Sequence, residues 1–533
     1  SQIVTFGTLA AREALKGVAR VLDIPYAESD RLAKMIPATP GTKLKEAIEP
    51  GTQLGKLYQD DPKVRELIDL ALEMEGTISN SGVHAAGVVI SRDPLDELVP
   101  LMHSKEGQLV TQYAMDHVAN LGLLKMDFLG LRNLTIIHDS INLIQKHEHK
   151  AVDMEHLPLD DTGVYEMLSL GETDGVFQLE SSGMKALVRD LKPTVFEDIN
   201  ALVALFRPGP LNSGMAETFV KRKNGKEKIS YEDPKLEPLL CDTYGTIVYQ
   251  EQIMQVSQVL AGYSLGQADL LRRAMGKKKP EEMDKQRQIF LDGAKNNNIP
   301  DKVANTLFDA MTEFAAYCFN RSHSAAYAMI AYQTAYLKKH HPVSYLAALL
   351  SSVANDLDKI KLYSLTAQKL GISILPPDIR VSDSDFTPDG NNIRYGLATI
   401  KNVGEGVVEK IILARNEHPF ETLADFCEHV GLKNVNRRVL ESLIFVGAFD
   451  EFGHSRKKLI NNIDNLYTYS QRLQESKDSG QSSLFSLLST DADAGRPQLI
   501  LDGDETEFTR GEIQQYEKTY LGTYVSCHPL EDV

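Results

Sequence analysis

Strand-like segments are concentrated in one stretch of this chain, residues 80–133, while helical patterns fill most of the remainder. Three runs in that stretch are apolar or alternating, with turn residues between them, as in β-strands: HAAGVVIS (84–91), QLVTQY (108–113) and LLKMDFLGL (123–131). Residues 1–80 instead carry apolar residues at helical spacing, notably before the stop signal Gly76. The pattern predicts a mainly α protein with one small α+β part.

The rest of the chain divides into further segments, as its length leads us to expect. Residues 134–350 are mostly helical with abrupt loops, and residues 380–398 predict a hairpin that turns at Pro388–Asn391. Two compact helical hairpins are expected over 397–450. Residues 470–505 are rich in Ser, Gln, Asp and Gly and predict a linker.

The composition argues against two classes of protein. No apolar run approaches the roughly 18–20 residues of a membrane span, and no secretory signal opens the chain, so we expect no membrane partner. The four cysteines lie far apart, in the pattern of neither a zinc site nor a disulfide framework, which favours free thiols in a reducing cytoplasm. The net charge of −17 argues against a chain covered by nucleic acid, although a local basic groove can sit on an acidic body. We interpret both ends, Ser1 and Val533, as cuts in a longer protein.

Asp127 is the single acid of the apolar run LLKMDFLGL. A carboxylate inside an apolar strand is costly unless it is paired or bound to a metal. Two interpretations stay open from the residues alone. Asp127 is either a satisfied buried aspartate that caps a neighbouring loop, or a carboxylate held at a strand end as a ligand of Mg²⁺. Mg²⁺ takes hard oxygen ligands and often shares them with substrate phosphates.

A basic run without acids spans residues 270–280 and contains Arg272, Arg273, Lys277, Lys278 and Lys279. Arginine binds phosphate through paired hydrogen bonds and lysine binds it as a point charge, so the run suits a triphosphate or a nucleic-acid backbone. A solvated basic face is the ordinary alternative. Upstream, Tyr249, Gln250 and Gln252 open a helix and could contact a base or sugar, although helix-start chemistry explains them about as well.

IKNVGEGVVEKII (400–412) has the form of a helix-hairpin-helix motif. Gly404 and Gly406 are expected to let the hairpin turn tightly and to expose backbone N–H groups to a DNA phosphate. Glu405 stands where an apolar residue is more usual, and VNRRVLESLIFVGAFD (435–450) looks like a degenerate second copy. A plain helical hairpin remains the alternative.

The predicted linker contains the peptide GQSSLFSLL (480–488). Gln481, Leu484 and Phe485 combine a polar group with two apolar side chains in an otherwise polar stretch. Such a peptide is a good docking element for a pocket on a partner protein, although short matches of this kind are often accidental.

Eight separated motifs, in collinear order over nearly the whole chain, resemble the bacterial C-family DNA polymerases, and within that family most closely the alpha subunits of DNA polymerase III. The motifs are HAAGVVIS, KMDFLGL, VFQLESSGMK, ALVALFRPGPL, YGTIVYQEQIMQ, LRRAMGKKKPEEM, FNRSHSAAYAMIAYQTAYLK and ILPPDI. The resemblance implies template-directed DNA synthesis and a multidomain architecture. Its expected parts are a thumb (1–80), the last part of the palm (81–133), fingers (134–395), a tandem helix-hairpin-helix (396–470), and a linker with a clamp-binding peptide and the start of a further domain (471–533).

The resemblance also implies roles for single residues. Asp127 matches the last of three catalytic aspartates that hold two Mg²⁺ ions, and Lys125 matches an active-site lysine on the same face of the strand. Arg272 and Arg273 match the triphosphate site for the incoming nucleotide, which Arg321 and His323 are expected to approach. Lys277, Lys278, Lys279 and the two glycines of the hairpin are expected to contact DNA. The implied partners are primer–template DNA, deoxynucleoside triphosphates, a sliding clamp bound through Gln481, Leu484 and Phe485, and the other subunits of the replicase.

One departure from the family pattern is large, because its Asp-x-Asp pair has no counterpart within residues 1–30. We therefore expect the 533 residues alone not to polymerise DNA. Two other functions remain open: an error-prone C-family repair polymerase, which the clamp-like peptide disfavours, and a non-catalytic DNA- or clamp-binding module, which Asp127, Lys125 and the arginine pair disfavour. An upstream Asp-x-Asp motif would support a polymerase.

Overall fold

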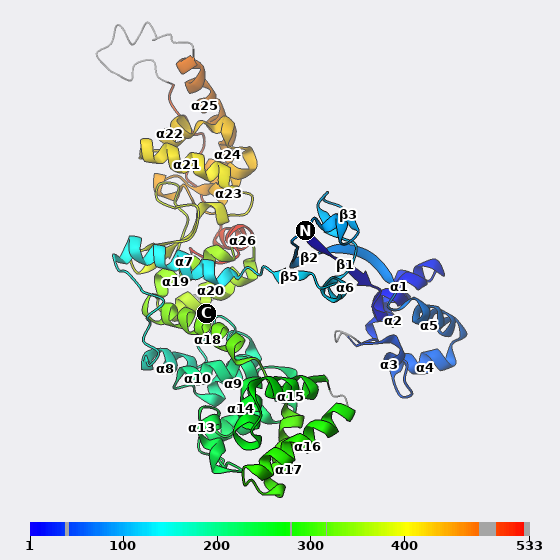
Figure 1. Ribbon diagram of the computed structural model, residues 1–533. Coiled ribbons are helices and arrows are strands. Elements are labelled where there is room, and N and C mark those ends of the chain that lie inside the picture. The colour runs from blue at the N-terminus through cyan, green and yellow to red at the C-terminus, as the bar shows by residue number, and fades with distance from the viewer. Residues whose placement is uncertain (38–41, 278–279, 316, 479–496, 527–533) are drawn as a thin grey trace, which may run out of the picture. The chain divides into compact units, whose positions relative to one another are not determined.

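The computed structural model describes residues 1–37, 42–277, 280–315, 317–478 and 497–526 (Figure 1). They form two compact units, Ser1–Leu131 and Arg132–Val533. Helices dominate, and the strands gather in two small sheets, which confirms the predicted fold class. In the described part, no helix is both long and apolar enough to span a bilayer.

The first unit contains a five-stranded sheet in the order β3-β4-β1-β2-β5. Its strands are β1 (Gln2–Thr8), β2 (Ile78–Ile90), β3 (Leu101–His103), β4 (Leu109–Thr111) and β5 (Leu124–Asp127). The expectation that residues 1–80 are helical is wrong for Gln2–Thr8, which form a central strand between β2 (antiparallel) and β4 (parallel). β5 pairs with β2 in antiparallel fashion and ends the sheet.

Helices of the first unit surround a core of their own. They are α1 (Ala11–Val21), α2 (Tyr26–Lys34), α3 (Leu44–Ala47), α4 (Gln53–Asp60), α5 (Pro62–Met74) and α6 (Met115–Asn120). Asp61 caps α5 by accepting the N–H groups of Lys63 and Val64, and Pro62 occupies its first turn, as helix-start preferences predict. Leu15, Leu67 and the other apolar faces of α1–α5 meet in this core.

The second unit begins with a long series of helices. They are α7 (Arg132–Leu143), α8 (Thr162–Ser169), α9 (Ser182–Leu191), α10 (Phe196–Leu205), α11 (Pro208–Asn212), α12 (Met215–Lys223), α13 (Glu237–Leu240), α14 (Gln250–Ala261), α15 (Leu265–Lys277), α16 (Pro280–Asn296), α17 (Asp301–Ala315), α18 (Arg321–His340), α19 (Pro342–Ser352) and α20 (Leu357–Lys369). A core built from α13–α17 supports the region that carries the basic run (Figure 1).

The remaining elements share one large core with α7, α19 and α20. They are β6 (Ile374–Leu375), β7 (Thr387–Asp389), β8 (Asn392–Arg394), α21 (Glu405–Glu417), α22 (Leu423–Phe426), α23 (Arg437–Phe445), α24 (Arg456–Asn461), α25 (Ile463–Asp478) and α26 (Arg510–Tyr520). β7 and β8 form the predicted hairpin, whose two-residue loop places Gly390 at a φ of +60°. The predicted linker starts too early, because α25 continues to Asp478.

The cysteines agree with the expected free thiols. Cys318 and Cys427 are buried and Cys241 is exposed, each without a disulfide, and burial raises the pKa of the Cys318 thiol to about 12. Cys527 lies outside the described residues.

Candidate functional site

Asp127 is the last residue of the edge strand β5, and its side chain is 44% exposed. Its Oδ1 lies 3.1 Å from Nζ of Lys125, which also lies 3.1 Å from Sδ of Met115 in α6. The interpretation as a buried, loop-capping aspartate is therefore wrong. β5 itself is largely exposed, with Leu124 at 57%, so the apolar run does not form a core strand. Asp127 is accessible to a ligand and is held beside a single cation.

Gly87 of β2 lies directly opposite Asp127 in the sheet. A Cβ atom at this position would lie 2.8 Å from Nδ1 of His84 and 3.1 Å from Cε of Lys125, so only a glycine lets both side chains lie over the strand. Nδ1 of His84 accepts the N–H groups of Gly87 (2.7 Å) and Ala86 (3.2 Å). This nitrogen therefore carries no proton, and the Nε2 atom does. The sequence alone predicts no role for His84. Gly87, a glycine inside a strand, is the residue that could have indicated that side chains pack closely over the backbone here.

The donor set around Asp127 fits one corner of a magnesium site. A carboxylate oxygen is the ligand that Mg²⁺ prefers, and this one is exposed at a strand end. Among the described residues, no group of three or more His, Cys, Asp or Glu side chains is arranged to hold a metal ion. Within the described part of the chain, Asp127 would therefore offer a metal ion one carboxylate ligand.

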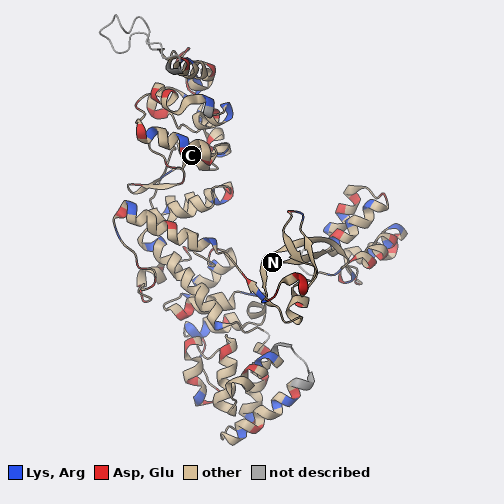
Figure 2. Ribbon diagram, turned by 45° about the horizontal axis from the view of Figure 1, so that its top comes forward, with Lys and Arg blue, Asp and Glu red and all other residues tan. Residues whose placement is uncertain are grey.

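Arg272 and Arg273 of α15 share one carboxylate, that of Asp269 on the preceding turn. Asp269 Oδ1 accepts Nε (3.0 Å) and Nη2 (2.7 Å) of Arg272, and its Oδ2 lies 2.9 Å from Nε of Arg273. The hydrogen bond from Arg272 is the main cause that lowers the pKa of Asp269. Asp269 thus places an acid directly before the basic run of residues 270–280, and Figure 2 shows acidic as well as basic residues on the helices of this unit. Asp269 stands three residues before Arg272 and four before Arg273, a spacing that predicts ion pairs on one face of a helix.

The start of α14 joins the arginine pair to the FNRSHS segment. Nη1 of Arg272 donates to Oε1 of Gln250 at 3.1 Å, and the backbone N–H of Gln250 donates to the carbonyl of Phe319 at 2.9 Å. The next residue, Glu251, accepts the backbone N–H of Arg321 at 2.9 Å. Three motifs that are far apart in sequence therefore meet at the first turn of α14.

Arg321 and His323 occupy the first turn of α18. Nη2 of Arg321 lies 3.3 Å from Glu197 and 3.4 Å from Asp242, so this guanidinium is engaged by two carboxylates. The exposed ring of His323 packs 4.4 Å from the ring of Tyr327, and its backbone N–H is capped by Asn320. Of the three arginine candidates for the nucleotide site, Arg273 is the most exposed, at 63% of its side chain.

The side chains of Tyr249 and Gln252 are buried and are not accessible to a ligand. Tyr249 is fully buried, and Gln252 is 1% exposed. Gln252 accepts the N–H groups of Val248 (2.9 Å) and Tyr249 (3.0 Å) and donates to Oγ1 of Thr243 (2.8 Å). The expected contact with a base or sugar is wrong for these two residues, and helix-start chemistry explains them.

The remaining DNA-binding candidates are only partly described. Lys277 ends α15, but its side chain, together with Lys278 and Lys279, lies outside the described part, as do Gln481, Leu484 and Phe485. Gly404 is the N-cap of α21 with φ −94°, and Gly406 follows in its first turn; the left-handed residue of this loop is Asn402 (φ +72°). The expectation that the glycines permit a tight turn is therefore wrong. A Cβ atom at either glycine would meet nothing within 4 Å, which leaves space beside the helix start for a phosphate.

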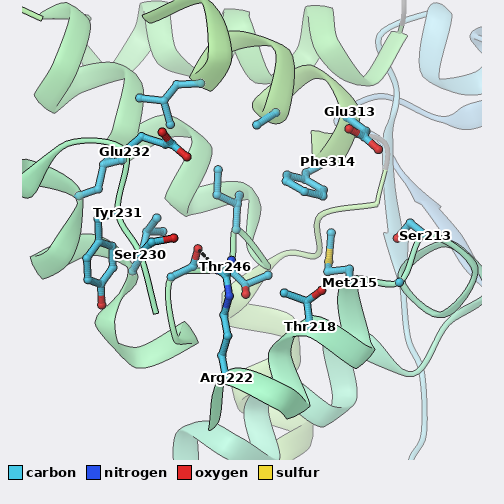
Figure 3. Close-up of a pocket in the computed structure, with 17 residues that line it drawn as sticks. Ser213, Met215, Thr218, Arg222, Ser230, Tyr231, Glu232, Thr246, Glu313 and Phe314 are labelled. Carbon is cyan, nitrogen blue, oxygen red and sulfur yellow. Dashed lines mark hydrogen bonds between the residues drawn. The ribbon is translucent and has the colours of Figure 1, made fainter. Parts of the chain in front are cut away.

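A cavity of about 290 Å³ lies in the same unit, between α12, α13 and α17 (Figure 3). Arg222 lines it, but this guanidinium already donates to Glu227 (2.9 Å) and to the carbonyl of Gly245 (3.2 Å). Glu232 and Glu313 also line the cavity and would repel a triphosphate. The cavity is thus poorly suited to a triphosphate.

Family models of known proteins match three parts of the chain. Residues 1–130 match the family model of the bacterial DNA polymerase III alpha NTPase domain, and residues 133–298 match that of the bacterial DNA polymerase III alpha subunit finger domain. Residues 371–459 match a helix-hairpin-helix motif.

Curated relatives match almost the whole chain. The chain is 46% identical over 538 residues to DNA polymerase III subunit alpha of Thermus aquaticus, 46% over 543 residues to that of Haemophilus influenzae, and 44% over 552 residues to that of Escherichia coli. Each match covers 99% of this chain but only 43%, 46% and 46% of the relative, respectively. The chain therefore spans less than half the length of these relatives.

Proposed function

The chain belongs to the family of bacterial DNA polymerase III alpha subunits, and from this membership we propose that it serves template-directed DNA synthesis, with Asp127 as a ligand of catalytic Mg²⁺. The observation that carries the proposal is the exposed carboxylate of Asp127 beside Lys125 at the end of β5, in a chain with this ancestry. Bound Mg²⁺ would activate the primer 3′-hydroxyl and neutralise charge on the leaving pyrophosphate.

The residues of the chain would divide the remaining work between them. Lys125 holds a positive charge 3.1 Å from Asp127, where it would balance the carboxylate and attract a phosphate. Arg272 and Arg273, with Arg321 and His323 at the neighbouring helix start, would bind the triphosphate of the incoming nucleotide. Their shared position at the first turn of α14 supports this assignment.

We further propose the domain roles that the resemblance implies. The thumb, palm, fingers and tandem helix-hairpin-helix would occupy 1–80, 81–133, 134–395 and 396–470. Lys277, Lys278, Lys279 and the N-terminus of α21 would contact primer–template DNA. Gln481, Leu484 and Phe485 in the last segment would bind a sliding clamp, within a replicase that works in the cytoplasm together with other subunits.

Residues 1–533 alone are proposed not to extend a primer. Mg²⁺ demands a near-octahedral shell, and two-metal chemistry needs carboxylates that bridge or flank both ions. In the described residues Asp127 has no partner group for such a site. Primer extension by the isolated 533 residues with Mg²⁺ tests this directly, and robust synthesis would refute it.

The experiment for the whole proposal uses the full-length polymerase that contains these residues. Asp127→Asn keeps the shape of the side chain and removes its charge, so we expect nucleotide incorporation to fall at least about 1000-fold while primer–template affinity stays within twofold, since a metal ligand supplies several kcal/mol to the transition state. Asp116→Asn, at an exposed position of α6, is the matched control. Near-normal turnover of Asp127→Asn would leave a DNA- or clamp-binding module as the better account.

A further inference from the structure

We propose that Asp269 and Gln250 are positioning residues that fix Arg272 as a rigid support and orient Arg273 toward the triphosphate of the incoming nucleotide. This inference rests on the proposed function, because it assigns the two arginines to nucleotide binding. It goes beyond that function in two ways. It assigns different roles to the two arginines, and it gives a positioning role to one acidic side chain, Asp269, and one uncharged side chain, Gln250.

Arg272 is held from two directions. Its Nε and Nη2 donate to Oδ1 of Asp269, at 3.0 and 2.7 Å, and its Nη1 donates to Oε1 of Gln250 at 3.1 Å. A guanidinium has five N–H donors in a fixed planar fork, so three such bonds leave it little freedom to rotate. Its side chain is also only 27% exposed. Arg272 therefore has a defined orientation before any nucleotide arrives.

Arg273 is held at one end only. Its Nε lies 2.9 Å from Oδ2 of Asp269, while among the described residues its two Nη atoms have no hydrogen-bond partner. The side chain is 63% exposed. A guanidinium anchored through Nε presents its paired Nη groups outward, in the geometry that binds a phosphate with two parallel bonds. Arg273 is thus the arginine that is ready to contact phosphate.

Asp269 also allows two like charges to stand side by side. Arg272 and Arg273 are neighbours in sequence, and the carboxylate lies between them with one oxygen on each. An aspartate is charged at neutral pH, and hydrogen bonding from Arg272 lowers the pKa of Asp269 further. Without this carboxylate, repulsion would drive the guanidinium groups apart and each would sample several rotamers.

Asp269 could instead compete with the triphosphate for the arginines, and the structure argues against this. Asp269 holds Arg273 through Nε, so a phosphate can bind the Nη atoms of Arg273 without displacing the carboxylate. Competition would make nucleotide binding tighter when the carboxylate is removed, whereas positioning makes it weaker. The two ideas therefore predict changes of opposite sign.

Gln250 connects this pair to the other half of the cluster. Its backbone N–H is bonded to the carbonyl of Phe319, the residue before Asn320, and its neighbour Glu251 holds the first backbone N–H of α18. The position of Arg272 is thereby tied to that of Arg321. Loss of the Gln250 side chain should loosen Arg272 without removing any charge.

The test measures single-nucleotide incorporation by the full-length polymerase and separates KM for the incoming nucleotide from kcat. We expect Asp269→Asn to raise KM about tenfold and Gln250→Ala about threefold, each with kcat and primer–template affinity within twofold of wild type. Asp269→Glu, which keeps the charge and both acceptors, should recover most of the loss. Asp292→Asn, an exposed acid on α16, is the control and should change nothing.

The outcomes separate this inference from the proposed function. If Arg272→Ala and Arg273→Ala raise KM but Asp269→Asn stays within twofold of the Asp292→Asn control, or lowers KM, the positioning role is wrong and the nucleotide site stands. If the arginine variants also leave KM unchanged, the nucleotide site itself is wrong. Primer–template affinity and circular dichroism of each variant identify a misfolded protein, and in that case Gln250→Ala, which is neutral and partly exposed, decides the question.

Discussion

Replacing Gln252 by alanine should open the first turn of α14 and disturb the arginine cluster. Gln252 is 1% exposed, and its Oε1 is the acceptor for the backbone N–H groups of Val248 and Tyr249, at 2.9 and 3.0 Å. Both of those residues are buried, so bulk solvent does not reach their N–H groups and the lost acceptor is replaced only in part. The preceding loop and the start of α14 would lose their common anchor.

The size of the effect follows from these contacts. A buried N–H group left without an acceptor costs roughly 1–3 kcal/mol. Removing the side chain of Gln252 also leaves room for about one water molecule, which offsets part of that cost. We therefore expect local opening to become about 2–4 kcal/mol easier. At 1.4 kcal/mol per factor of ten, hydrogen exchange at Val248 and Tyr249 should become roughly 30- to 1000-fold faster.

Hydrogen exchange measured by mass spectrometry on the full-length polymerase provides the assay. Gln255→Ala is the matched control, because Gln255 is an exposed glutamine on the same helix. Since Gln250 and Glu251 are the adjoining residues of that turn, KM for the incoming nucleotide should rise as well. Exchange at Val248 and Tyr249 within threefold of the Gln255→Ala value would show that this cap is not what holds the turn.

Three further predictions follow from other parts of the chain. Burial lowers the pKa of Lys338 to about 8, so the unfolded chain binds more protons between pH 8 and 10.5. The free energy of unfolding should therefore rise with pH in that window, by at most roughly 3 kcal/mol at 1.36 kcal/mol per pH unit. Lys338→Met should lack this rise. Chemical denaturation at several pH values checks it, and an equal pH dependence of the free energy of unfolding in both proteins would contradict the prediction. Gly404→Ala should leave the melting temperature within about 1 °C, because a Cβ there meets nothing within 4 Å, yet weaken binding of primer–template DNA in a fluorescence titration; unaltered DNA affinity would remove α21 from the DNA interface. Joint replacement of Leu484 and Phe485 by alanine should abolish clamp-dependent processivity and spare short, distributive synthesis, and an unchanged affinity for the clamp would exclude this peptide as the anchor.

Local signals in the sequence were sufficient for much of the fold. Asp61 followed by Pro62 specifies the start of α5, and the turn residues around Gly390 specify the β7–β8 hairpin. β1 could not be recognised in the same way. Its pairing partners, such as Val83 opposite Val4, lie some 80 residues away, and a short strand has little pattern of its own.

The candidate site was predictable as a set of residues but not as an arrangement. The spacing of Asp269 from Arg272 and Arg273 is readable on a helix, because i, i+3 and i, i+4 neighbours share a face. The contact between Gln250 and Arg272 cannot be predicted from the sequence, since it depends on how α14 packs against α15. Tyr249 and Gln252 show the same limit, because their residue types suit either a ligand or a buried cap.

Glycines give a similar lesson. The sequence predicts that Gly404 and Gly406 permit a tight turn, yet neither has a positive φ and the left-handed residue of the loop is Asn402. The sequence alone predicts no role for Gly87. In the structure it lies opposite Asp127 and leaves room for the side chains of His84 and Lys125 over β2. A glycine marks either a backbone angle or a close approach, and only the packed structure distinguishes the two.

Metal binding by Asp127 can be measured in the full-length polymerase. Mn²⁺ is titrated in the presence of primer–template and nucleotide, and its binding is followed by electron paramagnetic resonance. Removing one anionic ligand should weaken the tightest Mn²⁺ site of Asp127→Asn by at least about tenfold, while Asp116→Asn should bind as wild type does. Equal Mn²⁺ affinity for Asp127→Asn and the Asp116→Asn control would show that Asp127 is not a metal ligand.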